Sequence, residues 1–168
     1  GCNYVKTQKA IMAAFAGESQ ANRKYLAFAA KADQEGFSQA ARLFRAAAEA
    51  ETVHAHAHLR AAKGINSTLE NLKEAIAGET YEFESMYPPM IEAAKAEGNK
   101  EAERSFTYAF EVEKIHARLY QEMLDSLETA KESYSYYVCP VCGYTVEKEA
   151  PETCPVCGAK GKVFKKVD

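Results

Sequence analysis

The sequence has 168 residues, of which 47% are hydrophobic, and a formal net charge of −3. This length supports one domain of ordinary size with a small appendage, and the apolar content is sufficient for a packed core. Because the chain has no apolar run that could span a bilayer, no N-terminal signal pattern and no basic cluster, we expect a soluble, cytoplasmic protein that binds neither membranes nor nucleic acids.

Apolar residues recur at helical spacing in four long segments. We predict helices over about 4–31, 37–63, 66–90 and 100–127. Ser67 and Glu70 provide a capping signal for the third helix, and Gly64 is placed to end the second. Pro88 and Pro89 must kink or bulge the third helix. A polar, tyrosine-rich linker from Glu128 to Tyr137 follows the fourth helix.

Two helical hairpins repeat one pattern, a glutamate on the first helix followed by Glu-x-x-His on the second. The residues are Glu18 with Glu51 and His54 in the first hairpin, and Glu79 with Glu113 and His116 in the second. The offset between the repeats is 61 residues at the leading glutamate and 62 at Glu-x-x-His. This change predicts one inserted residue, a helical bulge, near the prolines.

Each Glu-x-x-His lies on an otherwise apolar helical stripe, where residues three apart share one face. A lone motif of this kind is more often a surface pair or a core histidine. An ionised carboxylate that points into a core, however, is costly unless it is paired or bound to metal. A glutamate from each of two helices with Glu-x-x-His from the other two is the ligand set of di-iron carboxylate bundles. The pattern therefore predicts a four-helix bundle around two ions, and its donors suit iron or manganese better than calcium or magnesium.

Glu82 breaks the symmetry of the repeat, because Ala21 occupies the equivalent position in the first hairpin. It lies one turn beyond Glu79 and can reach the same cluster. A seventh ligand would allow one iron to exchange ligands as its charge changes, since ferric iron favours carboxylate over imidazole. The alternative is a solvated carboxylate.

Four further side chains fall near the expected cluster. Tyr25 and Tyr87 lie at its level, where hydrogen bonding to a ligand carboxylate and simple core packing are equally compatible with the sequence. His58 is expected to pack beside the ligands, and His56 is expected to be solvated.

Four of the five cysteines form two Cys-x-x-Cys-Gly knuckles near the C-terminus. They are Cys139, Cys142, Cys154 and Cys157. This spacing predicts one tetrahedral metal held by four thiolates and leaves the choice between iron and zinc open. Tyr144 and Phe164 are expected to cover the site, and Cys2 is expected to be a free thiol.

Together, these residues resemble the rubrerythrins. The resemblance covers essentially the whole chain and implies a ferritin-like four-helix bundle over 1–133, followed by a small rubredoxin-like β/loop domain over 134–168 that binds one iron through four cysteines. It implies a peroxidase that reduces hydrogen peroxide at a non-haem di-iron centre. Electrons would pass through the rubredoxin-type iron from an external NAD(P)H-linked reductase or a rubredoxin.

The resemblance also implies roles for individual residues. The bridging carboxylates would be Glu51 and Glu113, and the terminal carboxylates Glu18 and Glu79. His116 would cap one iron, whereas His54 would bind the other when it is reduced and yield it to Glu82 when it is oxidised. Tyr25 and Tyr87 match the family's tyrosines beside the metal ligands.

The connection between the second and third helices, residues 64–67, is shorter than a ferritin-like topology requires, because those helices run parallel there and need a crossover as long as the bundle. Either the third helix runs antiparallel beside the second, or hairpins are exchanged between chains of a homodimer or larger homo-oligomer. We favour exchange.

Two other functions fit parts of the sequence. An iron-oxidising storage protein of the ferritin type would use the bundle but would need neither Glu82 nor the cysteines. An interaction protein with a zinc ribbon would use the cysteines but not the buried carboxylates.

Overall fold

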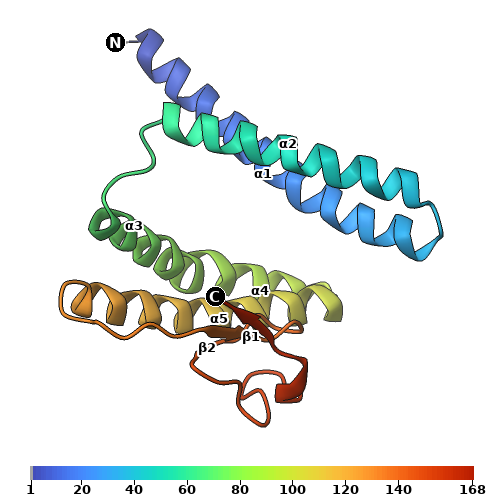
Figure 1. Cartoon of the computed structure of the whole chain (residues 1–168), viewed down its shortest axis with the longest axis vertical. Coiled ribbons are helices and arrows are strands. Elements are labelled where there is room, and N and C mark those ends of the chain that lie inside the picture. The colour runs from blue at the N-terminus through green and yellow to red at the C-terminus, as the bar shows by residue number, and fades with distance from the viewer. Residues whose placement is uncertain (1) are drawn as a thin grey trace. The chain divides into compact units, whose positions relative to one another are not determined.

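The computed structural model describes the backbone from Cys2 to Asp168 and the side chains from Tyr4 onward, so the expected free thiol of Cys2 lies outside the described residues. The chain forms two compact units, which divide between Asn66 and Ser67 and are described separately. Most of the described chain is helical, as the sequence predicts (Figure 1). None of the described helices combines the length and apolarity needed to span a bilayer.

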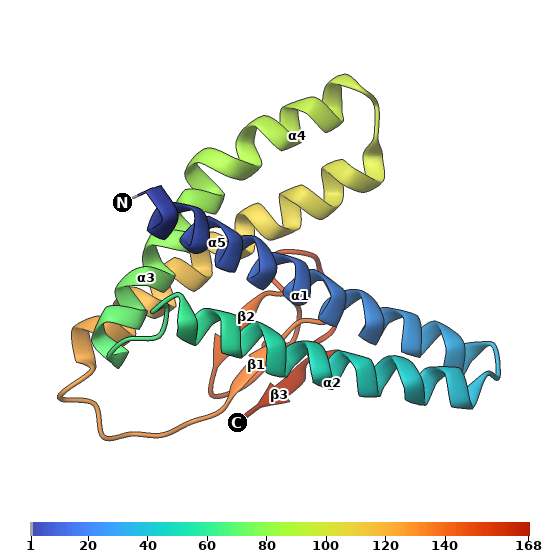
Figure 2. The same cartoon turned by 90° about the horizontal axis from the view of Figure 1, so that it is seen from above.

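The first unit is a hairpin of two long helices, α1 (Cys2–Gln34) and α2 (Ser38–Ala61), which lie side by side in Figures 1 and 2. Its buried apolar residues are all alanines: Ala29, Ala32, Ala41, Ala48 and Ala55. Small side chains allow the two helix backbones to approach closely. The buried Asn22 fixes their register, since its amide donates to the Ala48 carbonyl and the Thr52 hydroxyl, both at 2.8 Å.

The end of α2 differs from the prediction. The helix ends at Ala61 rather than Lys63, and Lys63, not Gly64, adopts the left-handed conformation (φ 59°). The Gly64 amide donates to the Leu59 carbonyl (2.9 Å) and the Lys63 amide to the Arg60 carbonyl (3.0 Å), which is the Schellman pattern. A β-carbon at position 64 would lie 2.5 Å from Leu59 Cδ1, so a larger residue there would require the Leu59 side chain to move.

The helices of the second unit are α3 (Thr68–Tyr81), the π-helical segment η1 (Glu82–Met86), α4 (Tyr87–Ala96) and α5 (Lys100–Ser126). A capping box starts α3, because Ser67 accepts from the Glu70 amide while Glu70 accepts from the Ser67 amide.

The π segment confirms the predicted bulge. The Tyr87 amide donates five residues back to the Glu82 carbonyl. The segment ends one residue before Pro88 and Pro89, which lack the amide hydrogens that a continuous α-helix would use.

The rest of the second unit is a small antiparallel sheet with strand order β2-β1-β3. Its strands are β1 (Tyr136–Val138), β2 (Thr145–Glu147) and β3 (Lys165–Val167), with a short 3-10 helix, η2 (Gly161–Val163), before β3. The expected linker is therefore shorter, because Tyr136 and Tyr137 pair within the sheet.

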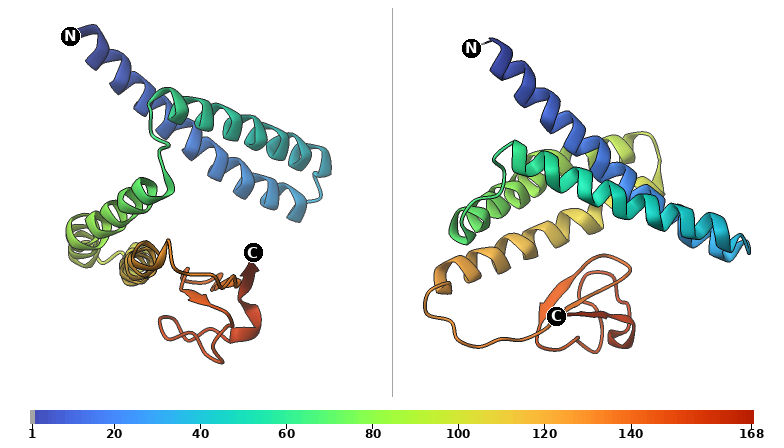
Figure 3. Two further views of the ribbon diagram at one scale, coloured as in Figure 1. Left: turned by 60° about the vertical axis from the view of Figure 1, so that its left-hand side comes forward. Right: turned by 45° about the horizontal axis from the view of Figure 1, so that its top comes forward.

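This sheet and its loops, called the cysteine module below (residues 134–168), pack against α5 (Figure 3). Val112 of α5 is buried against three of the cysteines, Cys139, Cys142 and Cys154. The rings of Tyr144 and Phe164 meet edge to face at 6.3 Å within the same cluster, as expected. The cysteine module and the α5 helix thus share one core.

Candidate metal centres

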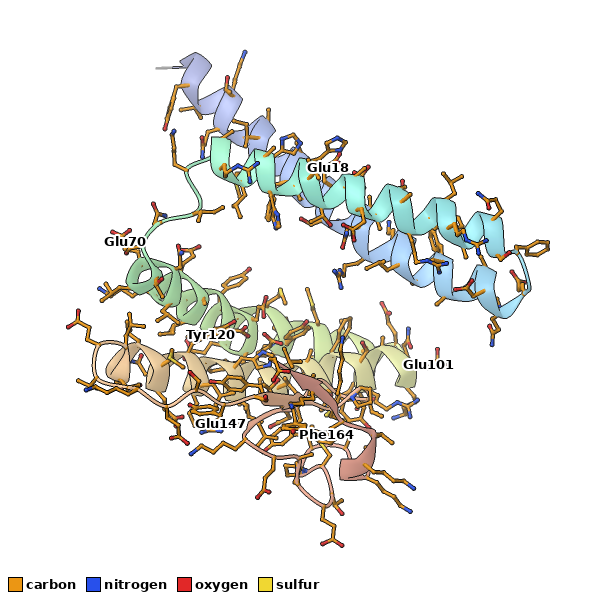
Figure 4. The ribbon with its side chains drawn as sticks, in the orientation of Figure 1. Glu18, Glu70, Glu101, Tyr120, Glu147 and Phe164 are labelled. Atoms are coloured by element: carbon orange, nitrogen blue, oxygen red, sulfur yellow. The ribbon has the colours of Figure 1, made fainter. Side chains whose placement is uncertain are left out.

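The first hairpin brings together one glutamate of α1 and the Glu-x-x-His of α2. Glu18 lies midway along the hairpin (Figure 4), and its Oε2 lies 3.0 Å from His54 Nδ1. Glu51 Oε2 lies 3.8 Å from the same nitrogen, so three ligand atoms gather within 4.8 Å of one another. The two carboxylates compete for one proton: a hydrogen bond between them, together with burial, raises the pKa of Glu51, and the same hydrogen bond lowers the pKa of Glu18. We call this cluster the first half-site.

The second hairpin gathers the equivalent residues, Glu79 of α3 with Glu113 and His116 of α5. Their ligand atoms also lie within 4.8 Å of one another. His116 Nδ1 lies 3.5 Å from Glu79 Oε1 and 3.9 Å from Glu113 Oε1. We call this cluster the second half-site. It is the more enclosed of the two, because the His116 side chain is 28% exposed and that of His54 is 56% exposed.

The second half-site holds more negative charge than its surroundings can stabilise. Burial and a hydrogen bond with Glu113 raise the pKa of Glu79 to about 9. Burial also acts on Glu113, but its interactions with His116, Glu79 and Glu82 outweigh it and lower its pKa to about 2. Among the described residues, Glu79 Oε2 is the buried side-chain oxygen that lacks any hydrogen-bond partner.

A bound cation would satisfy this oxygen and stabilise the ionised carboxylates, so the donors of this half-site fit a metal. Carboxylate and imidazole donors together suit iron.

Glu82 and Tyr87 flank the second half-site, at the two ends of the π segment. A hydrogen bond with Glu113 and burial raise the pKa of Glu82 to about 7, so the two carboxyls are neighbours. Burial, then the charges of Glu82, Glu113 and Glu79, raise the pKa of Tyr87. The ligand atoms within 4.8 Å of one another are those of Glu79, Glu113 and His116, so the roles of Glu82 and Tyr87 stay predictions.

The remaining candidates lie in the first hairpin. The Tyr25 ring packs against Phe28 and Phe44, with centroids 6.3 and 6.1 Å away, so its role beside the metal stays a prediction. His58 is half-buried and its charge acts on Glu18, which agrees with a place beside the ligands. His56 is exposed, as expected.

Two residues near the second half-site were not among the sequence candidates. Tyr120, labelled in Figure 4, has its pKa raised by burial and by the charges of Glu79 and Glu113. The sequence could have identified Tyr120, because it lies one turn after His116 on the same face of the helix. Thr145 of the cysteine module lies 2.8 Å from His116 Nε2. No sequence pattern identified Thr145, because the contact depends on how the module packs against α5.

The four cysteines form the second metal site. Sγ atoms of Cys139 and Cys157 lie 3.6 Å apart, as do those of Cys142 and Cys154. A disulfide would require about 2.05 Å. Thiolates around a tetrahedral metal at about 2.3 Å lie about 3.8 Å apart, close to the observed spacing.

Backbone amides help this site to hold negative charge. The Tyr144 amide donates to Cys142 Sγ at 3.4 Å. Burial disfavours the Cys139 thiolate, but hydrogen bonds from the Cys142 and Val141 amides outweigh it and lower the pKa of Cys139 to about 7. Burial raises the pKa of Cys142 and of Cys157, so these two thiolates require the charge of a bound cation.

Comparisons with known proteins support both the carboxylate and histidine site and the four-cysteine site. The family model described as "Rubrerythrin" matches residues 9–124, and the one described as "Rubrerythrin, rubredoxin-like domain" matches residues 137–165. Rubrerythrin-2 of Clostridium acetobutylicum is 38% identical, over 92% of each chain. Nigerythrin of Nitratidesulfovibrio vulgaris is 36% identical, over 90% of this chain and 81% of its own.

Solved structures give the same result. A structure described as the fully reduced, all-ferrous state of nigerythrin has a TM-score of 0.59 and 34% identity. The match covers 95% of this chain and 86% of the nigerythrin chain.

Proposed function

Because the chain belongs to the rubrerythrin family, with a di-iron centre and a four-cysteine iron site, we propose that it reduces hydrogen peroxide to water. The observation that carries this proposal is the third carboxylate beside the second half-site: Glu82, hydrogen-bonded to Glu113, is not needed to store iron. When bound, the two ferrous ions supply the two electrons that convert one peroxide and two protons into two water molecules.

The protein's own residues would hold the ions and the protons. In this proposal the bridges are Glu51 and Glu113, the terminal carboxylates are Glu18 and Glu79, and His116 caps one ion. His54 and Glu82 alternate on the other ion.

Proton supply follows from the titrating groups at the second half-site. The pKa of Glu82 is raised to about 7, so its carboxyl can hold or release a proton near neutral pH. Burial keeps the phenolic proton of Tyr87 on its Oη, where it can be donated to a carboxylate. Tyr25 is assigned the equivalent position in the first hairpin.

The cysteine module, residues 134–168, would act as the electron carrier and residues 1–133 as the di-iron bundle. Because Val112 packs on three of the cysteines, the carrier lies against the helix that supplies Glu113 and His116. An external NAD(P)H-linked reductase or a rubredoxin would reduce the module. This source of electrons rests on the family assignment.

The two half-sites of one centre would come from different chains. Glu51 lies ten residues before the end of α2 and Glu79 lies eleven residues after the start of α3, so parallel helices with both residues at one level leave about 31 Å to cross. Seven extended steps from Ala61 to Thr68 reach about 24 Å, and the Schellman turn at Lys63 shortens this reach further.

Exchange of hairpins within a homodimer avoids the long crossover. Each complete centre would then take α1 and α2 from one chain and the helices of the second unit from its partner.

Rapid mixing tests the peroxidase proposal. The iron-loaded protein is reduced without air and mixed with a small excess of hydrogen peroxide, while the visible absorption of the ferric four-cysteine site is followed. We expect the absorption to return faster than with dioxygen, and to return slowly in Glu51→Ala. A slow return that is equal for both oxidants would contradict the proposal and favour iron oxidation and storage.

A further inference from the structure

The contact between Thr145 and His116 joins the two metal sites and has a defined direction. Thr145 Oγ1 lies 2.8 Å from His116 Nε2 and 3.0 Å from the carbonyl oxygen of Gly143. A carbonyl oxygen can only accept a hydrogen bond, and a hydroxyl has a single proton. The Thr145 proton is therefore directed to Gly143, and its oxygen accepts from His116.

This direction determines the tautomer of His116. Since Nε2 must carry the proton that it donates to Thr145, Nδ1 of the neutral imidazole has a free lone pair. Nδ1 is the nitrogen that lies 3.5 Å from Glu79 Oε1 and 3.9 Å from Glu113 Oε1. The lone pair thus faces the carboxylates of the second half-site, as a metal ligand must.

Thr145 is itself held in place by the cysteine module. It begins β2, where its backbone pairs with Val138 of β1. Gly143, which accepts its proton, directly follows Cys142 of the first knuckle, and the Gly143 amide donates to the Cys139 carbonyl at 2.9 Å. A β-carbon on Gly143 would lie 3.7 Å from Val112 Cγ1, so this loop lies close against α5.

We propose that Thr145 is a positioning residue of the di-iron centre: its hydroxyl fixes the tautomer and the ring orientation of His116. The cysteine module therefore helps to build the di-iron centre in addition to carrying electrons to it. The inference rests on the proposed di-iron centre but not on peroxide as its substrate. Hydrogen bonds of this kind to ligand histidines change metal affinity about 10–100-fold when they are removed.

Three variants of the full-length protein test the proposal. Thr145→Val removes the hydroxyl and retains the shape and the strand preference, whereas Thr145→Ser retains the hydroxyl. Thr153→Val, at an exposed threonine of the same module, is the matched control. The absorption of the iron-loaded four-cysteine site shows that each module is folded.

The first measurement is NMR of the zinc-loaded protein, which is diamagnetic. We expect the Nε2 proton of His116 to be protected from solvent exchange in the wild type, in Thr145→Ser and in Thr153→Val, and to exchange at least about 10-fold faster in Thr145→Val. Rapid exchange of this proton in the wild type would overturn the proposal without any variant.

The second measurement is zinc affinity of the carboxylate and histidine donors, by competition with a chelator. We expect Thr145→Val to bind about 10–100-fold more weakly, and Thr145→Ser to stay within about threefold of the wild type. Equal affinity in Thr145→Val and the wild type would overturn the proposal. Both measurements give the same answer whether or not the protein reduces peroxide, so failure here is distinct from failure of the proposed function.

Discussion

Glu79 shows how a single carboxyl can be unfavourable to the fold and necessary to the site. Its Oε2 is buried without a hydrogen-bond partner, and burial together with Glu113 raises its pKa to about 9. In the metal-free protein the carboxyl therefore retains a proton at neutral pH. Metal binding must displace that proton, so loading becomes stronger as the pH rises.

The raised pKa of Glu79 predicts how the stability of the metal-free protein depends on pH. The folded state binds this proton more tightly than the unfolded state does, so the stabilisation is complete below about pH 4.5 and is lost as the pH rises through about 9. We expect Glu79→Gln, which mimics the protonated carboxyl, to lessen this loss by about 1–3 kcal/mol between pH 5 and 9.

The measurement is the free energy of unfolding of the metal-free protein by denaturant at several pH values. The control is Glu84→Gln, at an exposed position in the following turn, which should retain the wild-type slope. The lowered pKa of Glu113 acts only below about pH 4.5 and does not affect this window. An unchanged slope in Glu79→Gln would show that another group holds the proton.

The role of Glu82 can be tested by substitution. Since it lies beside the ligand atoms rather than among them, Glu82→Ala should leave two iron ions bound per centre. Peroxide turnover should fall by about 10–100-fold, because the carboxylate proposed to exchange with His54 is lost. Iron analysis and peroxidase assays with Glu84→Ala as the control separate the two effects. Wild-type turnover in Glu82→Ala would remove this residue from the mechanism.

Among the elements, the helices were predictable because each carries a long periodic pattern, and the π segment was predictable because the offset between the repeats changes by one residue. The left-handed position at Lys63 was not, because glycine is the usual residue there and Gly64 stands next to it. The contact of Thr145 with His116 also could not be predicted from the sequence. It depends on the path of a linker whose sequence has no periodic pattern.

The π segment precedes α4, and its effect on the packing of α4 against α5 can be tested by deletion. Tyr87 lies beside Phe106 of α5, with ring centroids 6.1 Å apart, and Ala94 is buried to 4% exposure. Deletion of Ser85 should close the π turn into a continuous α-helix and leave Tyr87 opposite Phe106, because Tyr25 of the uninterrupted α1 lies opposite Phe44 at the same 6.1 Å. Because those side chains then stay against α5, we expect stability to change by less than about 1 kcal/mol.

Thermal and denaturant unfolding measure this change. Deletion of Lys131, in the exposed linker after α5, is the matched control and should change stability by less than about 0.5 kcal/mol. A loss of more than about 2 kcal/mol on deletion of Ser85, but not of Lys131, would contradict the prediction and show that the π turn itself sets the packing of α4.

For the whole molecule, hairpin exchange predicts complementation between two inactive variants. Glu51→Ala damages the first half-site and Glu113→Ala the second, so each pure protein has one defect in every centre. In a mixed dimer with exchanged hairpins, one centre receives both defects and the other receives none. After the two variants are unfolded and refolded together, about a quarter of the wild-type centres should be intact.

Activity and iron content per chain after mixed refolding measure the complementation, and each variant refolded alone is the control. If hairpins stay within their own chain, every centre retains one defect and no activity returns. The proportion of wild-type centres that returns therefore reports directly on which chains share a centre.

The short connection between α2 and α3 also has a consequence for regulation by mass action. If a centre forms only where two chains meet, a lone chain has two incomplete sets of donors, and neither set holds iron tightly. The fraction of working enzyme then depends on the concentration of the protein itself, since dilution separates the donors as well as the chains. Iron would in turn favour pairing, so a cell short of iron would hold fewer dimers as well as fewer filled sites.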